Sequence, residues 1–401
     1  MNRYPAERSC PLRPPPEYAR WREEAPVTPV VLPGGRPAWL VTRYDDVRRL
    51  LRHPALSSDS THPGYPAFGS AVEVPPLSRS LIGLDGAAHE RLRRVLGAEF
   101  SVPAVARMQP ELDRIVDRAV DGLLAGPVPA DLVERFALPV ASRTICHVIG
   151  LGYESHEVFE HNTHVLTDGT RSAGQKAAAS AAITALVADL VGDRRRRARD
   201  DLASRLVTTG GLTDEEVVDN LVLLVAAGHD TSANMLALSA WTLLDDPAAG
   251  ADFLAAGPQG QQNAVEELLR FHSIIQLGLA RVATADIEVG DRIVRAGEGV
   301  VLGLPAANAD PRRFTEPDTL DLARADARRH LAFGFGPHQC LGHYLARTTL
   351  RTALAGLLGR LPGLRLADEA RAPQIKDSMD FHGLHRLPVH WETPVEGRDT
   401  A

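Results

Sequence analysis

The spacing of apolar residues along the chain predicts a mainly helical protein. Hydrophobic positions recur at intervals of three and four in six segments, as they do in helices with one buried face. These segments are 43–53, 86–101, 110–126, 174–197, 214–246 and 262–272. Alternation of apolar and polar residues between glycines, typical of strands in small sheets, is confined to 37–43, 280–304 and 385–391.

No change of composition along the chain resembles a linker between domains. We therefore expect a single domain across residues 1–401, with flexible tails at 1–20 and 393–401. The stretch 57–83 has the serine, glycine and proline content of a long loop. Loops of this length inside compact domains usually have a function, so we expect this one to line a binding site.

The longest predicted helix, 214–246, contains a polar interruption. It begins with the capping-box pair Thr213 and Glu216 and stops at Asp246 before a proline. At ~1.5 Å per residue it is roughly 50 Å long, and its middle is apolar on all sides, which predicts burial. Within it, the residues AAGHDTS at 226–232 include a glycine, an acid and two hydroxyls. We expect a kink there, because glycine weakens a helix and a threonine hydroxyl diverts a backbone hydrogen bond.

Cys340 lies in FGFGPHQCLG, residues 333–342, just before an apolar helical pattern that starts near Leu341. Only a thiolate binds metal well, and the amide dipoles at a helix N-terminus stabilise one. Gly334 and Gly342 permit tight turns and the close approach of a flat ligand. The sequence predicts that Cys340 is a metal ligand; the alternative is a buried cysteine in a glycine-rich turn.

Composition narrows the classes of function. With 44 basic and 51 acidic residues the net charge is −7, which argues against a nucleic-acid-binding surface. Three cysteines cannot build a disulfide framework, and the proline-rich N-terminal segment has no apolar stretch suited to export or a membrane span. We expect a cytoplasmic monomer that binds neither membrane nor nucleic acid.

Together these features resemble the bacterial class I (soluble) cytochrome P450 monooxygenases over essentially the whole chain. The proximal-loop motif of that family, Phe-x-x-Gly-x-x-x-Cys-x-Gly, is met by Phe333, Gly336, Cys340 and Gly342, and it is highly specific. The resemblance implies a mainly α fold with small β-sheets, a triangular helical prism crossed by a long central I-type helix. It also implies haem b (iron protoporphyrin IX) as cofactor, with the Cys340 thiolate as axial ligand of the iron.

The resemblance assigns roles to further side chains, including cations for the haem propionates. The implied cofactor-binding set is His89, Arg93, Arg281, Phe333, Gly334, His338, Cys340 and Gly342. On the opposite face, Asp230 and Thr231 are implied to relay protons to oxygen, with Gly228 making room for it.

A charge cluster is also implied by the resemblance. Glu267 and Arg270, three apart in EELLR, match the buried acid and arginine of the family, with Arg324 as a third member. Taken alone, the EELLR pattern also fits a solvated helix, and Arg324 also fits a surface arginine.

The substrate pocket is expected to be mostly apolar. Its expected contributors are the 57–83 loop, the region 155–180, and the turn near Met379. The individual pocket residues are Leu224, Ala227, Ile274, Ile275, Leu277 and Phe381. The implied reaction inserts one oxygen atom from O2, by hydroxylation or epoxidation, into a hydrophobic, medium-sized natural product such as a polyketide or terpenoid.

Electrons are expected from a ferredoxin or flavodoxin, because the chain has no flavin or nicotinamide domain and no cysteine set for an iron–sulfur cluster. A candidate docking patch consists of Arg91, Arg94, Arg347 and Arg351. Relatives carry small residues and an acid after the cysteine loop, so the choice of partner stays open. The departing residues are His343, Tyr344 and Thr348.

Two other classes of haem protein are alternatives, a peroxide-driven peroxygenase and a noncatalytic haem-binding protein or gas sensor. Neither needs the acid and alcohol at Asp230 and Thr231, so that pair favours the monooxygenase. The histidines at 156, 161 and 164 lack the HExxH spacing of a zinc site, and we interpret their segment as a surface helix.

Overall fold

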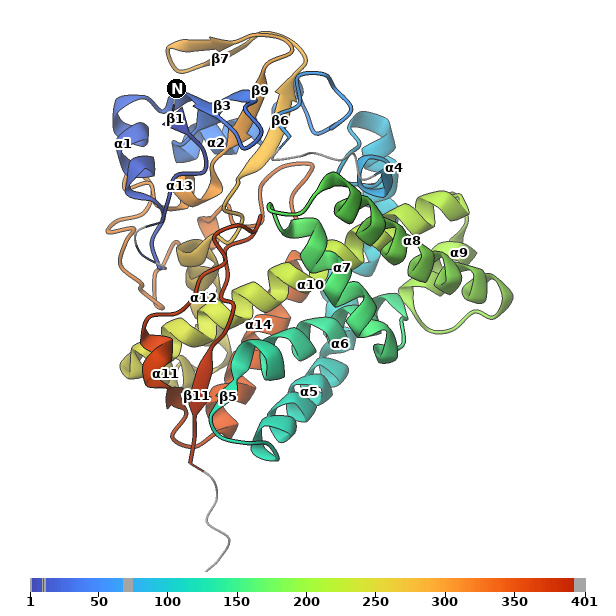
Figure 1. The fold of residues 1–401 in the computed structure, drawn as a ribbon, viewed down its shortest axis with the longest axis vertical. Coiled ribbons are helices and arrows are strands. Elements are labelled where there is room, and N and C mark those ends of the chain that lie inside the picture. The colour runs from blue at the N-terminus through green and yellow to red at the C-terminus, as the bar shows by residue number, and fades with distance from the viewer. Residues whose placement is uncertain (1, 9, 11, 68–74, 393–401) are drawn as a thin grey trace, which may run out of the picture.

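Helices make up most of the computed structural model, which describes residues 2–8, 10, 12–67 and 75–392 (Figure 1). The α-helices are α1 (Pro16–Glu24), α2 (Tyr44–Leu50), α3 (Pro75–Ser78), α4 (Gly86–Glu99), α5 (Val102–Leu124), α6 (Leu138–Ile149), α7 (His156–Thr167), α8 (Ala173–Arg196), α9 (Leu202–Thr209), α10 (Asp214–Asp245), α11 (Pro247–Ala255), α12 (Gly257–His272), α13 (Leu304–Asn308) and α14 (His343–Arg360). A π-helical turn spans Val133–Ala137, and 3-10 turns span Tyr153–Ser155, Ala327–Arg329 and Asp368–Arg371. The prediction of a mainly helical fold is confirmed.

The strands of the described residues form small sheets. They are β1 (Asn2–Arg3), β2 (Val27–Val31), β3 (Pro37–Val41), β4 (Leu56–Ser57), β5 (Ala130–Asp131), β6 (Leu279–Ala283), β7 (Ile287–Val289), β8 (Arg292–Val294), β9 (Gly299–Leu302), β10 (Arg365–Leu366) and β11 (Pro388–His390). The largest sheet has the order β1-β2-β3-β9-β6-β4, with β3 and β9 parallel. In Figure 1 this sheet lies at one end of the molecule beside α1 and α2. A second sheet, β10-β11-β5, and the hairpin β7-β8 complete the set.

Helix α10 runs through the centre of the helical region and packs against α6, α7, α8 and α14 (Figure 1). Within the described residues it is the one helix long and apolar enough to cross a membrane. Of its most apolar stretch, 72% is buried inside the protein, so its hydrophobicity serves the core. The prediction that this helix is buried is confirmed.

The ends of α10 follow the sequence signals. Thr213 Oγ1 accepts a hydrogen bond from the amide of Glu216 at 3.2 Å, and Glu216 Oε2 accepts one from the amide of Thr213 at 2.9 Å. At the other end Asp246 caps α11, so the two helices separate there. Between these caps the helix is continuous, and the predicted kink does not break it.

Gly228 has a packing role that the sequence did not reveal. A Cβ at this position would lie 2.9 Å from Cδ1 of Ile145 on α6. The missing side chain therefore lets α6 and α10 pack closely, which explains a glycine in the middle of an unbroken helix.

Helix α5 starts at Val102, eight residues before the start predicted at Pro110, so this proline lies inside the helix. Proline lacks an amide proton, so the helical hydrogen bond to the residue four positions earlier is absent. Burial of one helix face outweighs this loss. The buried face includes Val105, Leu112, Ile115 and Val116.

The prediction of a flexible tail at residues 1–20 is wrong for the part that the structure describes. Asn2 and Arg3 pair with β2, and the side chain of Tyr4 is only 2% exposed. The hydroxyl of Tyr4 donates to the carbonyl of Gln276 at 3.2 Å. Apolar and aromatic residues among the prolines and charges anchor this segment, and α1 follows it. Residues 393–401 lie outside the described residues.

Candidate functional site

A mainly apolar cavity of about 450 Å³ lies between α10 and the loop that leads into α14, and its volume is in the range of small-molecule sites. All six residues predicted for the substrate pocket line it: Leu224, Ala227, Ile274, Ile275, Leu277 and Phe381. The 57–83 loop contributes Leu81 and Ile82 among its described residues. No residue of the region 155–180 lines the cavity, and α7 packs against α10. The turn near Met379 lines it through Asp380 and Phe381, although Met379 itself does not.

Glycines shape the loop that carries Cys340. The amide of Cys340 donates to the carbonyl of Phe333 at 2.9 Å, which closes the loop. Gly336 has a φ of 80°, and a Cβ there would come within 2.9 Å of Arg52 Cβ. Gly334 also has a positive φ, 68°. The turn therefore needs glycine at both positions.

The Cys340 side chain lines the cavity wall and is exposed to the open space of the cavity, which lies inside the protein. Burial raises the pKa of the thiol, while the amide of Gly342 and the guanidinium groups of Arg93 and Arg347 lower it. Helix α14 begins at His343, two residues after the predicted start. The sulfur is the atom of this loop with the chemistry of a soft metal ligand.

Part of the cavity wall carries basic side chains. His89, Arg93 and His338 line it, and the ring centroids of the two histidines are 4.2 Å apart. Arg93 Nη1 donates to the carbonyl of Gln339 at 2.7 Å. Burial, followed by the nearby His338 and Arg93, lowers the pKa of His89 to about 4. His338 Nε2 lies 3.0 Å from Asp85 Oδ1, and the lowered pKa leaves His89 neutral near pH 7. An anionic group of a ligand would therefore meet the positive charge of Arg93, with the imidazole rings as polar neighbours.

Arg281 is placed differently from these three side chains. It lies on β6, is 7% exposed and does not line the cavity. Its guanidinium donates to the carbonyl of Ala280 at 2.6 Å, and Tyr65 and Asp85 are its electrostatic neighbours. Arg281 also lowers the pKa of His89, so it supports the basic wall from outside the cavity lining.

Two observations show that the site fits a flat ligand with an anionic edge. The Nε2 atom of His89 is buried and has no hydrogen-bond partner among the described residues, and buried polar atoms normally have one. A Cβ on Gly342 would meet no atom within 4 Å, so open space lies against the cysteine loop.

Thr231 and Gly228 bring α10 into the cavity wall. The Thr231 hydroxyl donates to the carbonyl of Ala227 at 2.6 Å. This is the diverted hydrogen bond that the sequence predicted, although the helix continues past it.

Asp230 turns away from the cavity and does not line it. Its side chain is buried, Thr167 donates to its Oδ2 at 2.9 Å, and His229 Nδ1 lies 3.3 Å from its Oδ1. Burial alone would raise the pKa of Asp230, but the contact with His229 and the charge of Lys376 outweigh it and lower the pKa. The acid and the alcohol are adjacent in sequence, but only the alcohol faces the cavity.

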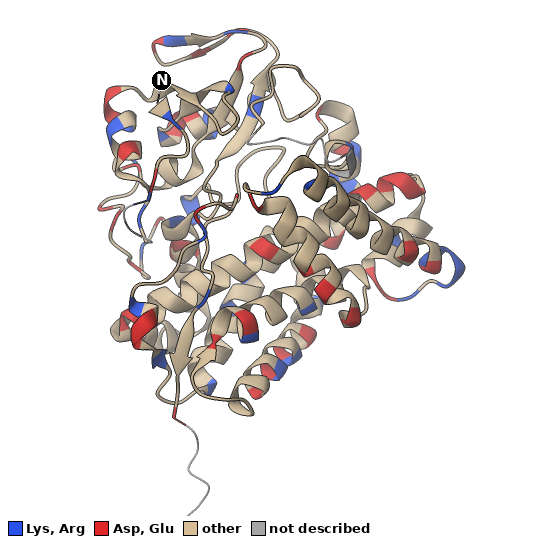
Figure 2. Cartoon of the chain, in the orientation of Figure 1, with Lys and Arg blue, Asp and Glu red and all other residues tan. Residues whose placement is uncertain are grey.

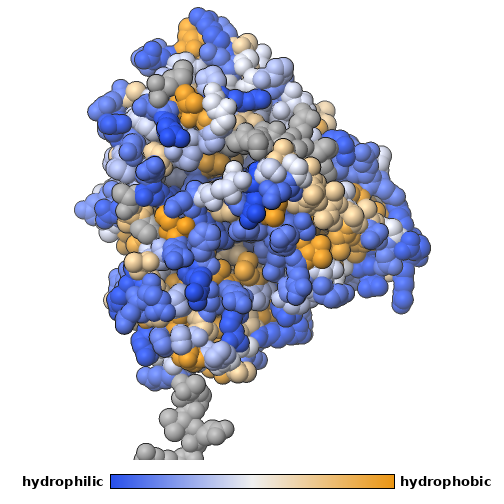
Figure 3. Space-filling view, viewed as in Figure 1, coloured by the Kyte–Doolittle hydropathy of each residue, from blue (hydrophilic) through white to orange (hydrophobic). Residues whose placement is uncertain are grey.

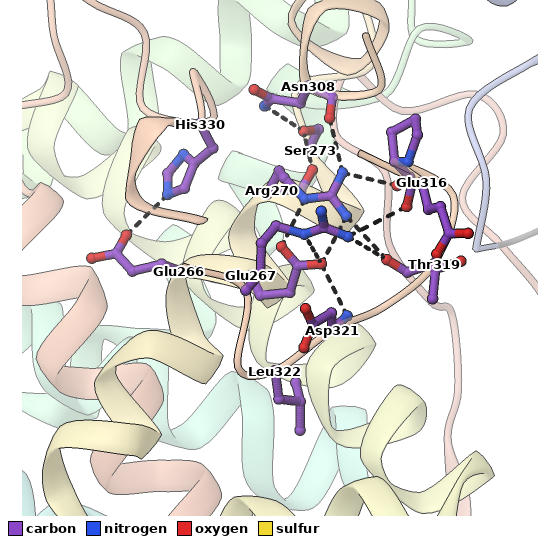
Figure 4. A network of polar contacts seen from close by, with 12 residues as sticks. Glu266, Glu267, Arg270, Ser273, Asn308, Glu316, Thr319, Asp321, Leu322 and His330 are labelled. Carbon is purple, nitrogen blue, oxygen red and sulfur yellow. Dashed lines mark hydrogen bonds and ion pairs between the residues drawn. The ribbon is translucent and has the colours of Figure 1, made fainter. Parts of the chain in front are cut away.

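The predicted charge cluster is assembled and buried (Figure 4). The carboxylate of Glu267 accepts two hydrogen bonds from Arg270, at 2.7 and 2.8 Å, and one from Arg324 at 3.0 Å. The three side chains are only 0–8% exposed. The two guanidinium groups also donate to the backbone carbonyls of Asn308, Thr315, Glu316, Pro317 and Thr319. The cluster thereby fixes the segment 308–324 against α12.

Sequence reasoning missed the neighbouring acid, Glu266. Its Oε2 lies 3.0 Å from His330 Nε2 (Figure 4), and its Oε1 accepts from Arg347 Nε at 2.8 Å. Arg347 lies over the ring of Phe333, 4.6 Å from its centroid. These contacts join α12 to α14 around the cysteine loop. Two adjacent acids in EELLR were the available signal, but their partners are distant in sequence.

The three histidines of α7 do not form a metal site. Within the described part of the chain, no three His, Cys, Asp or Glu side chains gather closely enough to bind a metal ion. His156 instead stacks on Tyr153, with ring centroids 4.1 Å apart.

Comparison with known proteins agrees with this architecture. The family model of cytochrome P450 matches residues 261–375, which include the charge cluster and the cysteine loop. The chain is 41% identical to cytochrome P450-SU2 of Streptomyces griseolus over 390 residues, 96% of each chain. It is 41% identical to pentalenic acid synthase of Streptomyces avermitilis, covering 97% of each chain.

Solved structures share the whole fold. The mycinamicin VIII C21 methyl hydroxylase of Micromonospora griseorubida, in a crystal structure with mycinamicin VIII bound, superposes with a TM-score of 0.91 at 38% identity. The match covers 98% of this chain and 100% of that one. The family model includes the cysteine loop and the buried charge cluster, and the relatives match this chain over nearly its full length. The chain therefore belongs to the cytochrome P450 family.

Proposed function

We propose that this protein is a haem-thiolate monooxygenase that inserts one oxygen atom of O2, by hydroxylation or epoxidation, into a hydrophobic natural product. The observation that carries the proposal is the placement of Cys340. Its sulfur opens into a mainly apolar cavity that also contains a basic wall and a helix hydroxyl. Family membership implies haem with thiolate ligation, and we propose haem b.

The residues present suit this cofactor. Cys340 would be the axial ligand, and His89, Arg93 and His338 would bind the propionates, with Arg281 supporting them electrostatically. Phe333 and Gly334 hold the loop beside the sulfur, and Gly342 leaves the ligand space. When bound, thiolate-ligated haem supplies the reductive activation of O2.

Thr231 is the group placed to handle protons at the cavity wall. Its hydroxyl donates to Ala227 and can at the same time accept a hydrogen bond from a ligand or water. Asp230 is the acid next to it in sequence, and the chain Thr167–Asp230–His229 extends away from the cavity. We propose that protons reach Thr231 through a rearrangement of this buried group.

The substrate is expected to be apolar and of medium size, because aliphatic and aromatic side chains dominate the cavity. Relatives named for polyketide and terpenoid chemistry, such as the mycinamicin hydroxylase and pentalenic acid synthase, support the same class. We propose a polyketide or terpenoid substrate for this chain as well.

We propose that the enzyme is a cytoplasmic monomer. Its electron donor is proposed to be a ferredoxin or a flavodoxin. Two of the four arginines suggested for docking already have acidic partners. Arg91 pairs with Glu216 and Arg347 with Glu266, which leaves Arg94 and Arg351 as the better candidates. Lys, Arg, Asp and Glu are interspersed over the helices rather than separated into faces (Figure 2). Hydrophilic residues also predominate on the face in Figure 3, so a donor would be recognised by a few local charges.

Turnover in a reconstituted system tests this function. The haem-loaded protein would be screened for a Soret shift against polyketides and terpenoids, then supplied with ferredoxin, ferredoxin reductase and isotopically labelled O2. The expected product carries one labelled oxygen atom. A product labelled only from water would contradict oxygen insertion, and peroxide alone supporting equal turnover would favour a peroxygenase.

A further inference from the structure

Asp380 occupies a rigid turn at the edge of the cavity. Its amide donates to the carbonyl of Thr167 at the end of α7, at 3.0 Å. On either side of it, Met379 bridges to Asp168 and Phe381 bridges to Ile275. The backbone of Asp380 is therefore held by α7 on one side and by the segment before β6 on the other, so the side chain starts from a fixed point at the cavity edge.

The carboxyl group of Asp380 has no hydrogen-bond partner in the part of the chain that the structure describes, although the residue lines the cavity. The two neighbouring acids are paired. Asp168 accepts from Arg171 at 2.9 Å, and Asp230 accepts from Thr167 at 2.9 Å. Of these three acids, Asp380 is therefore the one whose carboxylate oxygens are available to bind a ligand.

The surrounding charges reinforce this assignment. Burial raises the pKa of Asp380 to about 6; Lys176 opposes this, and the negative charges of Asp168 and Asp230 add to it. Asp380 is half-buried at the wall of a mainly apolar cavity, where a carboxylate without a partner is unfavourable, so its charge would be stabilised by a cation that a ligand brings.

The basic groups nearby are engaged elsewhere. Lys376 donates to Asn234 at 2.8 Å and its electrostatic partner is Asp230, and Arg171 pairs with Asp168. His164 faces Lys376, Asp230 and Asp168, and burial lowers its pKa. Lys176 acts on Asp380 only through its charge.

We propose that Asp380 is a specificity-determining residue that binds a protonated amine on an otherwise apolar substrate. This inference rests on the proposed function and narrows its substrate class to molecules that combine a hydrophobic body with a basic nitrogen. A quaternary or protonated nitrogen beside Asp380 would replace the missing protein partner, while the aliphatic wall would hold the rest of the molecule.

A matched pair of probes tests the proposal without knowledge of the substrate. The haem-loaded protein would be titrated calorimetrically with (adamantan-1-ylmethyl)trimethylammonium, whose nitrogen cannot coordinate iron, and with neutral adamantan-1-ylmethanol. The wild-type protein should bind the cation about tenfold more tightly, because the trimethylammonium group has no N–H to donate and is attracted to Asp380 by its charge alone. This preference should grow as the pH rises through about 6 and Asp380 ionises.

The substitution Asp380→Asn keeps the shape of the side chain and removes its charge. It should abolish the tenfold preference and its pH dependence while leaving the affinity for the alcohol nearly unchanged. Asp368→Asn, at a fully exposed position outside the cavity, should keep the preference. Equal loss of both affinities in Asp380→Asn, or an unchanged preference, would overturn the proposal.

The test separates this inference from the proposed function. A protein that lacks the thiolate signature of the reduced carbon monoxide complex would refute the proposed function itself. A protein that has this signature and binds both probes with equal affinity would refute only the role of Asp380. Tight binding of the alcohol alone would show that the carboxyl group recognises neutral donors and would also overturn the assignment.

Discussion

Thr231 must satisfy two demands with one hydroxyl group. Its proton is already used in the 2.6 Å hydrogen bond to the carbonyl of Ala227, while the same side chain lines the cavity. A hydroxyl has one proton but two lone pairs, so it can accept from a ligand without leaving the helix bond. Donation to a ligand would require the Ala227 bond to break.

Replacement of Thr231 by alanine should leave haem and substrate binding intact and lower the coupling of electron consumption to product several-fold. The diverted electrons should appear as peroxide, because the hydroxyl no longer holds a proton or water in the cavity. The ratio of product formed to reductant consumed measures this. Thr231→Ser should restore most of the coupling, and unchanged coupling in the alanine variant would exclude the role.

Asp380 should make the stability of the protein depend on pH. Its folded-state pKa of about 6 is above the 3.8 of an ordinary aspartate, so the folded state holds this proton more tightly than the unfolded state. The contribution of Asp380 to stability is therefore largest below about pH 4, and this contribution, about 3 kcal/mol, is lost as the pH rises through about 6.

Urea denaturation at about pH 5 and pH 8 measures the effect. Roughly 1.4 kcal/mol of the loss lies in this interval. Asp380→Asn should remove that part of the pH dependence, whereas Asp368→Asn should not. An identical slope in wild type and Asp380→Asn would mean that folding does not raise the pKa of this carboxyl group.

Some residue assignments could be made from sequence and others could not. The loop motif and the apolar positions on one side of α10 identify cavity residues, because local pattern decides which way they face. The partner of Asp230 is Thr167, 63 positions away, so no local pattern could reveal that this acid turns from the cavity. Asp380 was not singled out from the sequence, because its place at the cavity depends on a hydrogen bond from its amide to the carbonyl of Thr167 at the end of α7.

Helix ends were predicted well where a side chain caps the backbone. The capping box of α10 is present as predicted, and α8 begins with the same arrangement at Ser172 and Gln175. The start of α5 could not be predicted, since burial of an apolar face overrides the interior Pro110. The N-terminal segment was misjudged for the same reason, because the packing of Tyr4 depends on residues hundreds of positions away.

The cap of α10 should contribute measurably to stability. Thr213→Ala removes the acceptor for the amide of Glu216 and should lower the free energy of unfolding by about 1 kcal/mol. Chemical denaturation measures this. Thr209→Ala, at an exposed site in the last turn of α9 where no amide is capped, is the control and should cause no loss. Equal effects of the two substitutions would contradict the assignment.

At the scale of the whole molecule, buried ion clusters join segments that the sequence separates. Glu267, Arg270 and Arg324 hold the 308–324 segment, and Glu266 contacts His330 beside them (Figure 4). Glu266 also pairs with Arg347 on α14, the helix that follows the cysteine loop. The first cluster was predictable from a family resemblance. The second needed the fold, because Arg347 is 81 residues from Glu266.

Removal of one member should show how strongly the fold depends on the first cluster. Arg324→Ala leaves the buried carboxylate of Glu267 short of one donor and should lower the free energy of unfolding by about 3–5 kcal/mol. Arg371→Ala, which breaks an exposed pair with Asp368, should have little effect. Comparable losses in the two variants, measured by chemical denaturation, would show that the cluster is not a stabilising centre.

The most direct measurement is the absorption spectrum of the reduced carbon monoxide complex of the wild-type protein and of Cys340→Ala. The position of Cys340 in the cavity predicts the strongly red-shifted Soret band of thiolate-ligated haem in the wild type, and the absence of that band in the variant. A variant that retains the red-shifted band, or a haem-loaded wild type that lacks it, would contradict the assignment of Cys340 as the haem ligand.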